Sequence, residues 1–515
     1  MPAEFRNEPI KDFSDAEDRR KMQEALEYVK SQFDREYPLY IDGKDVVSGR
    51  TFQSFNPANK EQVVGTFQKA GVEEVDMAID AAQRAFESWK RVDPKERADI
   101  LFQAAEKMRQ RRFELNAWMV YETSKSWVEA DGDTAEAIDF MEFYGREMLR
   151  YNERQPLTPV PGEDNQLFYI PLGMGAVIPP WNFPNAILVG MSTAAIVTGN
   201  TVLLKPSSDA PAVGYRFVEI MKDVGLPAGV LNFIPGSGSE IGDYIVEHPK
   251  TRFIAFTGSM EVGLRVNELA AKKSEGQIWI KRIVAEMGGK DGIVVDSEAD
   301  LKAAADGTVA SAFGFQGQKC SACSRVIVDE KVYDRFCDML VERTRKLTVG
   351  STDDPKNFMG AVINQSAADN TMNYIQIGRQ EGKLLIGGER GDSRGHFIMP
   401  TIFRDIAPNA RLAQEEVFAP VLAVIKAKNF DDALNIANNT IYGLTGAVYS
   451  QNKDKIARAR QDFHVGNLYF NRKCTGALVG GQPFGGFNMS GTDSKAGGRD
   501  YLLLFLQAKT VSKKL

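Results

Sequence analysis

Cysteine and histidine are scarce in this sequence of 515 residues, which holds four cysteines and three histidines. Four cysteines in so long a chain are too few for a disulfide framework, which favours a reducing compartment, the cytoplasm. Zinc needs a second ligand pair beside Cys320 and Cys323, and Cys337 and Cys474 are isolated, so no metal site is expected. None of the histidines lies in a sequence typical of a general base. A reactive cysteine in this chain therefore needs a carboxylate as its base.

Long apolar runs and clusters of one charge are also missing. No apolar run approaches the roughly 18 residues of a membrane helix, and the first six residues, MPAEFR, do not resemble a secretory signal. The 63 basic and 69 acidic residues are interspersed and give a formal net charge of −6. This balance argues against a nucleic-acid partner and against a membrane partner, because both bind clustered Lys and Arg. A small-molecule substrate is the expected partner.

The chain is too long for a single core, so two or three domains are expected. Ser14–Glu17 has the pattern of a capping box that opens a helix reaching about Phe33. The segment 38–47 predicts two short strands around Asp42-Gly43, which is typical of a hairpin turn. From residue 72 to about residue 151 the apolar residues recur at helical spacing.

Short apolar runs then alternate with segments of helical length, which predicts parallel βαβ units whose ligand lies at the carboxyl ends of the strands. A second alternation of strands and helices follows residue 285 and predicts a second α/β domain, with the boundary close to Glu286–Gly289. A Leu-rich segment, 502–506, is followed by 509–513, which suggests a strand or arm at the end of the chain that pairs with a neighbouring subunit. The predicted strands are 175–178, 201–204, 230–234, 252–256, 292–295 and 325–328, and the predicted helices are 184–198, 209–224, 239–247, 299–313 and 331–347.

Cys320 is the first candidate for chemistry. It lies among small residues in Gly317–Cys323, where substrate and backbone N–H donors can approach closely. Lys319 and Arg325 are expected to favour the thiolate, which is the reactive form. The competing interpretation is a small buried hydrophobic residue, which most isolated cysteines are.

Two polar residues at predicted strand ends complete this candidate site. Glu286 ends an apolar run, and partial burial there would raise its pKa towards the range of a general base. The alternative for Glu286 is a solvated side chain at a strand end. Asn182, in a rigid turn between a strand and a helix, presents an amide donor for an oxyanion. It is also a candidate cap for the helix 184–198, and the two roles are not exclusive.

Two glycine-containing turns suggest a phosphate site. Residues 256–259 follow a strand and open a helix, whose N-terminal amides can hold a phosphate. The loop 236–242 is one residue too long for the usual dinucleotide fingerprint, and such loops are often only turns. Lys205, at the end of another strand, adds a cation where a ribose would lie.

Taken together these segments resemble the aldehyde dehydrogenase superfamily. Their order and spacing agree over about 300 residues of the chain. The matching segments are PWNFP (180–184), KPS (205–207), FTGS (256–259), EMGGK (286–290), GQKC (317–320), EEVF (415–418) and PFGG (483–486).

The resemblance implies a role for each matching position. Cys320 would be the nucleophile, Glu286 the general base, and Asn182 with the Cys320 backbone N–H the oxyanion hole. The cofactor-binding positions would be Lys205 and Ser208 near the adenosine ribose, Gly258 and Ser259 at the pyrophosphate, and Glu416 and Phe418 around the nicotinamide ribose.

Two further segments, 320–325 and 475–486, resemble the 1-pyrroline-5-carboxylate dehydrogenase branch of this superfamily. That branch implies that Ser321 and the backbone of Gly476 and Ala477 bind the α-carboxylate of the substrate, in the manner of an anion-binding nest. Phe183 and Phe484 would flank its aliphatic stem.

Two positions depart from the superfamily pattern. Ser208 stands where NAD-preferring relatives often carry a Glu, so NAD is the expected cofactor and NADP is expected to be tolerated. Ala419 replaces a Gly, which is a minor change.

The resemblance also implies an α/β aldehyde dehydrogenase fold with a Rossmann-like NAD-binding domain, an α/β catalytic domain and a small β oligomerisation arm. The implied assembly is a homodimer or an assembly of dimers. The implied divisions are N-terminal helices and hairpin that join the cofactor-binding domain (1–151), the arm (152–171), the NAD-binding domain (172–286), the catalytic domain (287–495) and a C-terminal arm (496–515).

The expected reaction is NAD-dependent oxidation of L-glutamate 5-semialdehyde to L-glutamate through a Cys320 thiohemiacetal and thioester, in proline or arginine degradation. A neighbouring hypothesis is a dehydrogenase for another short carboxylated semialdehyde. Two more distant hypotheses are a thiol acyltransferase or hydrolase without nicotinamide and a non-catalytic structural protein.

Overall fold

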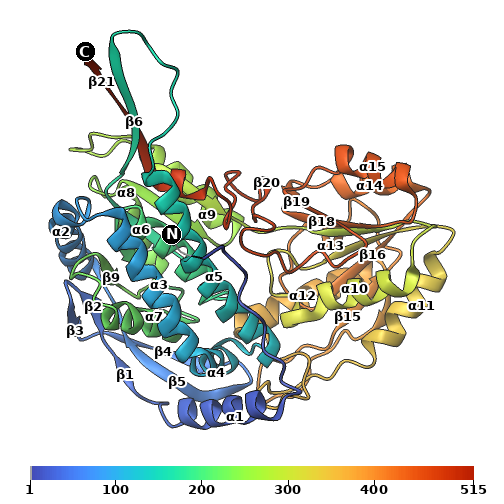
Figure 1. The fold of residues 1–515 in the computed structure, drawn as a ribbon. Helices are drawn as coiled ribbons and strands as arrows, with labels where there is room; N and C mark the ends of the chain where they lie inside the picture. The colour runs from blue at the N-terminus through green and yellow to red at the C-terminus, as the bar shows by residue number, and fades with distance from the viewer. Residues whose placement is uncertain (1–2) are drawn as a thin grey trace.

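The computed structural model describes residues 3–515, so the first two residues of the implied region 1–151 lie outside the described residues. Figure 1 shows two bodies of helices and strands side by side, with a long two-stranded ribbon projecting from one of them. Each body is built on a seven-stranded sheet. The α/β class predicted from alternating strands and helices is therefore what the chain adopts.

The N-terminal elements follow the sequence prediction with one correction. Helix α1 (Ala16–Lys30) is capped by Asp15, whose side chain accepts from the backbone N–H groups of Glu17 and Asp18. The prediction of Ser14 as the cap is wrong, because the adjacent Asp15 carboxylate takes both of these amides. The predicted hairpin is confirmed as β2 (Leu39–Ile41) and β3 (Lys44–Val46). Its turn residues Asp42 and Gly43 both have positive φ, as a type I′ turn requires.

The predicted helical region is confirmed as four consecutive helices: α2 (Val72–Trp89), α3 (Pro94–Gln110), α4 (Arg112–Thr123) and α5 (Trp127–Asn152). A three-stranded sheet that the sequence did not predict precedes them, in the order β1 (Glu36–Tyr37), β5 (Asn59–Gln68) and β4 (Thr51–Asn56).

The first seven-stranded sheet holds the predicted βαβ units. Its order is β11-β10-β7-β8-β9-β2-β3, and the neighbours from β11 to β9 are parallel. The predicted helix 239–247 is split, because its first part forms a π-helical turn, η1 (Gly238–Gly242), before α8. The strands are β7 (Met174–Ile178), β8 (Thr201–Leu204), β9 (Leu231–Phe233), β10 (Phe253–Thr257) and β11 (Arg282–Glu286), and the helices are α6 (Ala186–Val197), α7 (Pro211–Asp223), α8 (Asp243–Glu247) and α9 (Met260–Ala271).

The second sheet begins after Glu286, in the order β14-β15-β16-β13-β12-β18-β19, with only the edge strand β14 antiparallel. Two short strands, β17 (Tyr442–Gly443) and β20 (Phe487–Asn488), pair beside it. Its strands are β12 (Gly292–Val295), β13 (Arg325–Asp329), β14 (Lys383–Ile386), β15 (Thr401–Arg404), β16 (Val421–Ala427), β18 (Thr445–Tyr449) and β19 (Asn467–Phe470), and its helices are α10 (Leu301–Phe313), α11 (Tyr333–Thr344), α12 (Gln365–Glu381), α13 (Arg411–Gln414), α14 (Phe430–Asn438) and α15 (Lys453–Asp462).

Helix α6 lies at the centre of the first body. It carries no charged residue, and all but one of its twelve residues are buried between the sheet and helices α3 and α5. A helix that is apolar on all sides is stable only inside a protein, so the sequence of α6 requires it to be buried on every side. The turn that contains Asn182 leads directly into this rigid helix.

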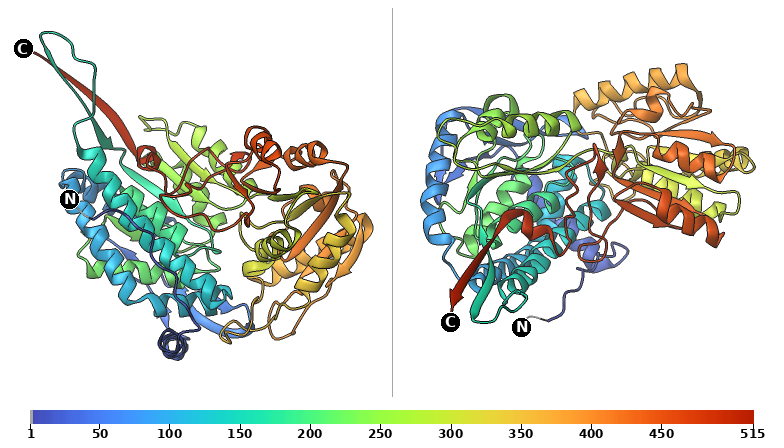
Figure 2. Two further views of the ribbon diagram at one scale, coloured as in Figure 1. Left: turned by 45° about the vertical axis from the view of Figure 1, so that its right-hand side comes forward. Right: turned by 90° about the horizontal axis from the view of Figure 1, so that it is seen from above.

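The projecting ribbon consists of β6 (Glu163–Pro171) and β21 (Leu506–Lys514), paired antiparallel along their whole length. Figure 2 shows it extending away from both bodies, with the C-terminus at its tip. The Leu-rich segment was expected to be part of a strand or arm, and most of it is instead the 3-10 turn η3 (Tyr501–Phe505). Tyr501, Leu502 and Phe505 are buried in the core, and this burial overrides the strand pattern.

Candidate active site

The carboxyl ends of the parallel strands bring the predicted catalytic residues together. Glu286 is the last residue of β11 and pairs with Thr257 at the end of β10. The next strand, β7, ends at Ile178 and leads into the turn that carries Asn182. Cys320 reaches the same place from the second body, in the loop between α10 and β13. The site therefore lies between the two sheets.

The loop before Cys320 has an unusual backbone. Phe315, Gln316 and Gly317 are consecutive residues with φ of 50°, 57° and 67°. Non-glycine residues in this region cost about 1–3 kcal/mol each and persist only where their surroundings hold them. Gln316 supplies that support, because its Nε2 donates to the carbonyls of Ser124 and Ala361 at 2.9 Å. A Cβ at Gly317 would clash with the Ala419 carbonyl, which explains the glycine in GQKC.

Asn182 is bonded to this nucleophile loop. Its Nδ2 donates to the Gln318 carbonyl at 3.0 Å, and the side chain is buried. The expected helix cap at Asn182 is not found, because the residue that precedes α6 is Asn185. An amide nitrogen has two hydrogens, so Asn182 keeps one for an oxyanion beside Cys320.

Glu286 is held by the loop that carries the PFGG segment. The Gly486 N–H donates to its Oε1 at 3.3 Å, and the Ser494 hydroxyl donates to its Oε2 at 3.4 Å. Burial raises the pKa of Glu286 well above its usual value, more than these two hydrogen bonds lower it. A carboxyl group of this kind is suited to take a proton near neutral pH.

The pKa of the Cys320 thiol is raised well above its usual value, first by burial and next by the Glu286 carboxylate. The expectation that Lys319 and Arg325 favour the thiolate is therefore wrong. Lys319 forms an ion pair with Glu129 at 2.6 Å, and Arg325 is buried and donates to backbone carbonyls, among them that of Lys290 at 3.0 Å. Both cations have other partners, so neither offsets the effect of burial and of Glu286 on the thiol.

A cavity of about 400 Å³ joins these residues to the predicted substrate positions. Cys320 and Glu286 line it, and it is walled by α5, α6 and the segment 473–484. All five residues predicted to bind the substrate also line it: Phe183, Ser321, Gly476, Ala477 and Phe484.

The loop that carries Gly476 and Ala477 is fixed from one side by Arg472, which donates to the carbonyls of Thr475 and Gly476 at 2.8 and 3.0 Å. Gly476 has φ of 78°. Within residues 3–515 the amides of Gly476 and Ala477 donate to no protein acceptor. Two such amides at a cavity wall can accept an anion. We call residues 475–482 the anchor loop.

Charged residues of α5 that were not predicted from the sequence line the same cavity. They are Glu129, Asp133, Glu136 and Asp139, together with Lys319 and Lys473 from the loops opposite. Burial raises the pKa of Glu136 to about 8. The sequence does contain a signal, because acidic residues recur at three- and four-residue spacing on a helix that is otherwise buried.

Lys205 and Ser259, two of the predicted cofactor positions, lie beyond the carboxyl ends of strands β8 and β10 of the first sheet. Lys205 follows β8 and is buried, which lowers its pKa to about 8, and within residues 3–515 its ammonium donates only to the Pro206 carbonyl at 3.4 Å. Ser259 caps α9, and Gly258 lies so close to the Phe256 ring that a Cβ would approach it to 2.6 Å. Ser208, near Lys205, is within 3.5 Å of the Gly236 carbonyl. A buried cation without a carboxylate and the N-terminal amides of α9 fit a phosphate- and ribose-bearing cofactor.

Glu416 reaches this region from the second body. Its carboxylate accepts from the Gly289 N–H at 2.9 Å, and burial raises its pKa to about 7. A Cβ at Gly288 would overlap this carboxylate, and one at Gly289 would meet Asp291 and the Cys320 carbonyl, which explains the two glycines of EMGGK. Phe418 has φ of 57° and packs edge-on against Trp181, with 5.6 Å between ring centroids.

No group of three or more His, Cys, Asp or Glu side chains in residues 3–515 is placed to hold a metal ion. Over the same residues no helix is both long and apolar enough to cross a membrane.

Known proteins share this fold and much of this sequence. Residues 45–511 match the model of the aldehyde dehydrogenase family. A 1-pyrroline-5-carboxylate dehydrogenase of Geobacillus thermodenitrificans (strain NG80-2) is 59% identical over 513 residues, and one of Bacillus cytotoxicus is 57% identical over 515 residues; each match covers 100% of both chains. The crystal structure of a 1-pyrroline-5-carboxylate dehydrogenase from Thermus with bound NAD is 50% identical, with a TM-score of 0.99 and 100% of both chains covered.

Proposed function

The chain belongs to the aldehyde dehydrogenase family, and we infer from this that it catalyses the NAD-dependent oxidation of L-glutamate 5-semialdehyde to L-glutamate. This is the activity of a 1-pyrroline-5-carboxylate dehydrogenase, because the semialdehyde is in equilibrium with cyclic 1-pyrroline-5-carboxylate. The reaction belongs to proline degradation. The family match sets aside the acyltransferase and the non-catalytic hypotheses. The observation that carries the assignment is full-length similarity to such dehydrogenases together with Cys320 and Glu286 in one cavity.

We propose that the Cys320 thiol first loses its proton to solvent and that the thiolate then attacks the aldehyde carbon, so that a C–S bond forms while the carbonyl π electrons move onto oxygen. The resulting thiohemiacetal oxyanion is held by the Cys320 N–H and by Asn182, whose position is fixed through Gln318. NAD, which Lys205, Ser259 and Glu416 would hold, would supply the hydride acceptor for the step in which the thioester forms. Glu286 then takes a proton from water, and the hydroxide attacks the thioester carbonyl. The C–S bond breaks, the thiolate recovers a proton, and glutamate is released.

The cavity has groups for each part of an amino-acid aldehyde. Ser321 and the free amides of Gly476 and Ala477 bind the α-carboxylate, and Phe183 and Phe484 flank the aliphatic stem. The cavity is lined by ionisable groups of both kinds, with basic residues on the loops and acidic residues on α5. A zwitterionic head requires both signs in a site that excludes water, and a plain aldehyde requires neither.

The cofactor positions follow from the same arrangement. Lys205 would contact the adenosine ribose, Gly258 and Ser259 would hold the pyrophosphate at the N-terminus of α9, and Glu416 and Phe418 would position the nicotinamide ribose. Ser208 adds no negative charge beside the adenosine ribose, so NADP is used as well, though less efficiently than NAD. Ser208→Glu should reduce the rate with NADP while preserving the rate with NAD. Equal losses of rate with both cofactors would show that residue 208 does not determine the preference between NAD and NADP.

The remaining candidate is a dehydrogenase for another short carboxylated semialdehyde. One methylene more or less in an apolar pocket changes kcat/KM only about 10–200-fold, so the two candidates are separated by measurement. Comparing kcat/KM for glutamate 5-semialdehyde, succinate semialdehyde and aspartate 4-semialdehyde decides between them. We expect the highest value for glutamate 5-semialdehyde, and a higher value for either of the others would reassign the substrate.

The protein acts as a homodimer or an assembly of dimers in the cytoplasm. The exposed edges of the β6–β21 ribbon are available to a second copy of the chain. In this proposal the chain divides into an NAD-binding domain (172–286), a catalytic domain (287–495) and two segments that contain the ribbon strands (152–171 and 496–515). All four cysteines are free thiols, as a reducing compartment favours.

A further inference from the structure

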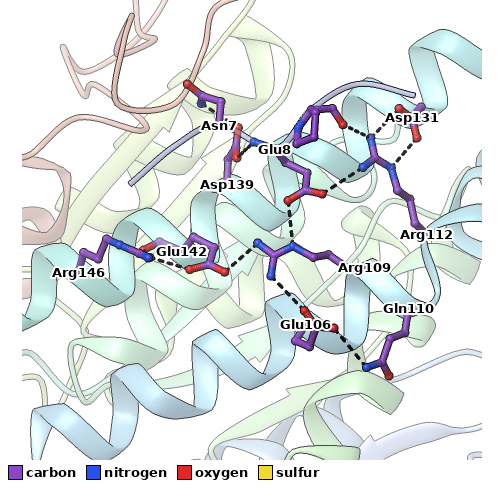
Figure 3. Close-up of polar contacts among 11 residues, drawn as sticks. Asn7, Glu8, Glu106, Arg109, Gln110, Arg112, Asp131, Asp139, Glu142 and Arg146 are labelled. Atoms are coloured by element: carbon purple, nitrogen blue, oxygen red, sulfur yellow. Dashed lines mark hydrogen bonds and ion pairs between the residues drawn. The ribbon is translucent and has the colours of Figure 1, made fainter. Parts of the chain in front are cut away.

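Residues 3–13, which precede α1, cross the outer side of α5 before the chain turns into its first helix. We call this segment the N-terminal strap. Figure 3 shows that Asn7 and Glu8 of the strap meet side chains of α3, α4 and α5. Backbone hydrogen bonds at Ala3, Pro9 and Lys11 bind the strap on either side of these two residues. Glu8 and Ile10 of the strap also line the cavity that contains Cys320.

Asn7 joins the two walls of this cavity. Its Nδ2 donates to Asp139 on α5 at 2.8 Å and to the Val479 carbonyl of the anchor loop at 2.9 Å. The neighbouring Glu8 N–H donates to the other oxygen of Asp139 at 2.6 Å. One amide group therefore ties the helix that carries the acidic wall to the loop that carries Gly476 and Ala477.

Ion pairs hold the strap in register on this surface. Glu8 accepts from Arg109 at 2.9 Å and from Arg112 at 3.2 Å, and Arg112 also donates to the Pro9 carbonyl at 2.9 Å. Arg112 is buried and forms a second ion pair with Asp131 at 2.6 Å. Glu8 is thus paired with two guanidinium groups, which fix the position of the strap on α3 and α4.

An aromatic contact reinforces the tie to the anchor loop. The Phe5 ring packs edge-on against Phe143 of α5, with 5.2 Å between centroids. A Cβ added to Gly480 of the anchor loop would lie 3.1 Å from both rings. The loop therefore rests against a surface made jointly by the strap and α5.

The anchor loop needs such support because its own sequence is flexible. It contains three glycines, Gly476, Gly480 and Gly481, and glycine loses the most conformational freedom on ordering. If the anchor loop is already ordered before the substrate binds, binding does not have to order it. Contacts from the strap and α5 therefore reduce the entropic cost of substrate binding.

We propose that the N-terminal strap is a specificity-determining element of the aldehyde site, in which Asn7 is the positioning residue that fixes the anchor loop against α5. This inference rests on the proposed function, because the loop it positions is the one that holds the substrate α-carboxylate. The strap does not take part in the chemistry, and its polar contacts are with α1, α3, α4, α5 and the anchor loop. Its contribution is to the binding of a carboxylate-bearing aldehyde.

Asn7→Ala removes both amide donations and tests the proposal. We expect the KM for glutamate 5-semialdehyde to rise about five- to tenfold, as the loss of one or two hydrogen bonds implies. The values of kcat and of the KM for NAD should stay within about twofold of wild type, because the reacting groups are untouched. Butanal, which has no carboxylate for the anchor loop, should be oxidised with unchanged kcat/KM.

Arg6→Ala is the matched control, since Arg6 is an exposed strap residue that makes no hydrogen bond or ion pair within residues 3–515. It should behave as wild type with both aldehydes. Asn7→Asp, which places a carboxylate against Asp139 and the Val479 carbonyl, should raise the KM at least as much as Asn7→Ala.

A folded Asn7→Ala enzyme with unchanged KM for glutamate 5-semialdehyde would overturn the inference. Equal losses with butanal would overturn it too, because they would indicate general structural damage. A wild-type enzyme that oxidises butanal but not glutamate 5-semialdehyde would instead overturn the proposed substrate, which keeps the two failures distinguishable.

Discussion

At the level of single residues, Cys320 and Glu286 form an electrostatic pair. Burial and the Glu286 carboxylate both raise the pKa of the thiol. A thiol with a raised pKa is protonated at neutral pH and becomes more reactive as pH rises, because the thiolate is the nucleophile. We therefore expect kcat/KM to increase from neutral to alkaline pH, and initial rates across this range measure the increase. A flat profile would mean that thiol ionisation does not limit the reaction.

Glu286→Gln separates the two roles of the carboxylate. Removing its negative charge should lower the pKa of Cys320, so that alkylation by iodoacetamide begins at a lower pH than in wild type. The same change removes the general base, and kcat should fall about 10²–10⁴-fold. The pH profile of alkylation and steady-state NADH production measure the two effects.

An unchanged alkylation profile in Glu286→Gln would show that the two groups do not interact. The control is Glu298→Gln, an exposed carboxylate near Asn452 and Lys455 in the second body, which should alter neither readout.

Asn182→Ala should lower kcat about 10²–10³-fold, the usual loss when one oxyanion donor is removed. Because Asn182 also bonds the Gln318 carbonyl, the melting temperature is measured in parallel. A variant of normal stability and full kcat would exclude Asn182 from the oxyanion hole.

At the level of elements, the loops that meet at the strand ends depend on glycines. Gly288 leaves room for the Glu416 carboxylate, which is bonded to the next residue, Gly289. Gly288→Ala should displace Glu416 and raise the KM for NAD about tenfold, with little change in the KM for the aldehyde. Initial rates at varied NAD concentrations measure this. A rise confined to the aldehyde KM would place Glu416 on the substrate side instead.

The regular elements were largely predictable from the sequence. The helices from residue 72 to residue 152 and the parallel strands of the first sheet follow from the local spacing of apolar residues. The Leu-rich turn at 501–505 was not predictable, because distant residues bury it and override its strand pattern. The cap of α1 was misplaced by one residue, because two adjacent residues, Ser14 and Asp15, are both good caps.

The predicted site residues lie where the strand ends and the nucleophile loop meet, and the cavity gathers the five substrate positions. The pKa of Cys320 was mispredicted, because burial and the Glu286 carboxylate raise it, and neither is visible in the sequence around Cys320, while Lys319 forms an ion pair with Glu129 instead. The strap was missed for the same reason, since Asn7 contacts Val479 across almost the whole length of the chain.

At the level of the whole molecule, the β6–β21 ribbon stands apart from the two bodies and pairs residues 163–171 with residues 506–514 at the end of the chain. A chain ended after Phe505 lacks β21 and leaves the inner edge of β6 unpaired. We expect this variant to run as a monomer, and the full chain to run as a dimer or larger assembly, in size-exclusion chromatography with light scattering. A truncated chain of unchanged assembly state would show that the ribbon does not mediate assembly.

Cys320 is the residue on which the proposed oxidation of glutamate 5-semialdehyde by NAD depends. The most direct test is the absorbance of NADH after 1-pyrroline-5-carboxylate and NAD are added to the wild-type protein and to Cys320→Ala. We expect steady NADH formation by wild type and none by Cys320→Ala, although the variant still binds NAD. NADH formation by the variant, or none by wild type, would contradict the proposed reaction.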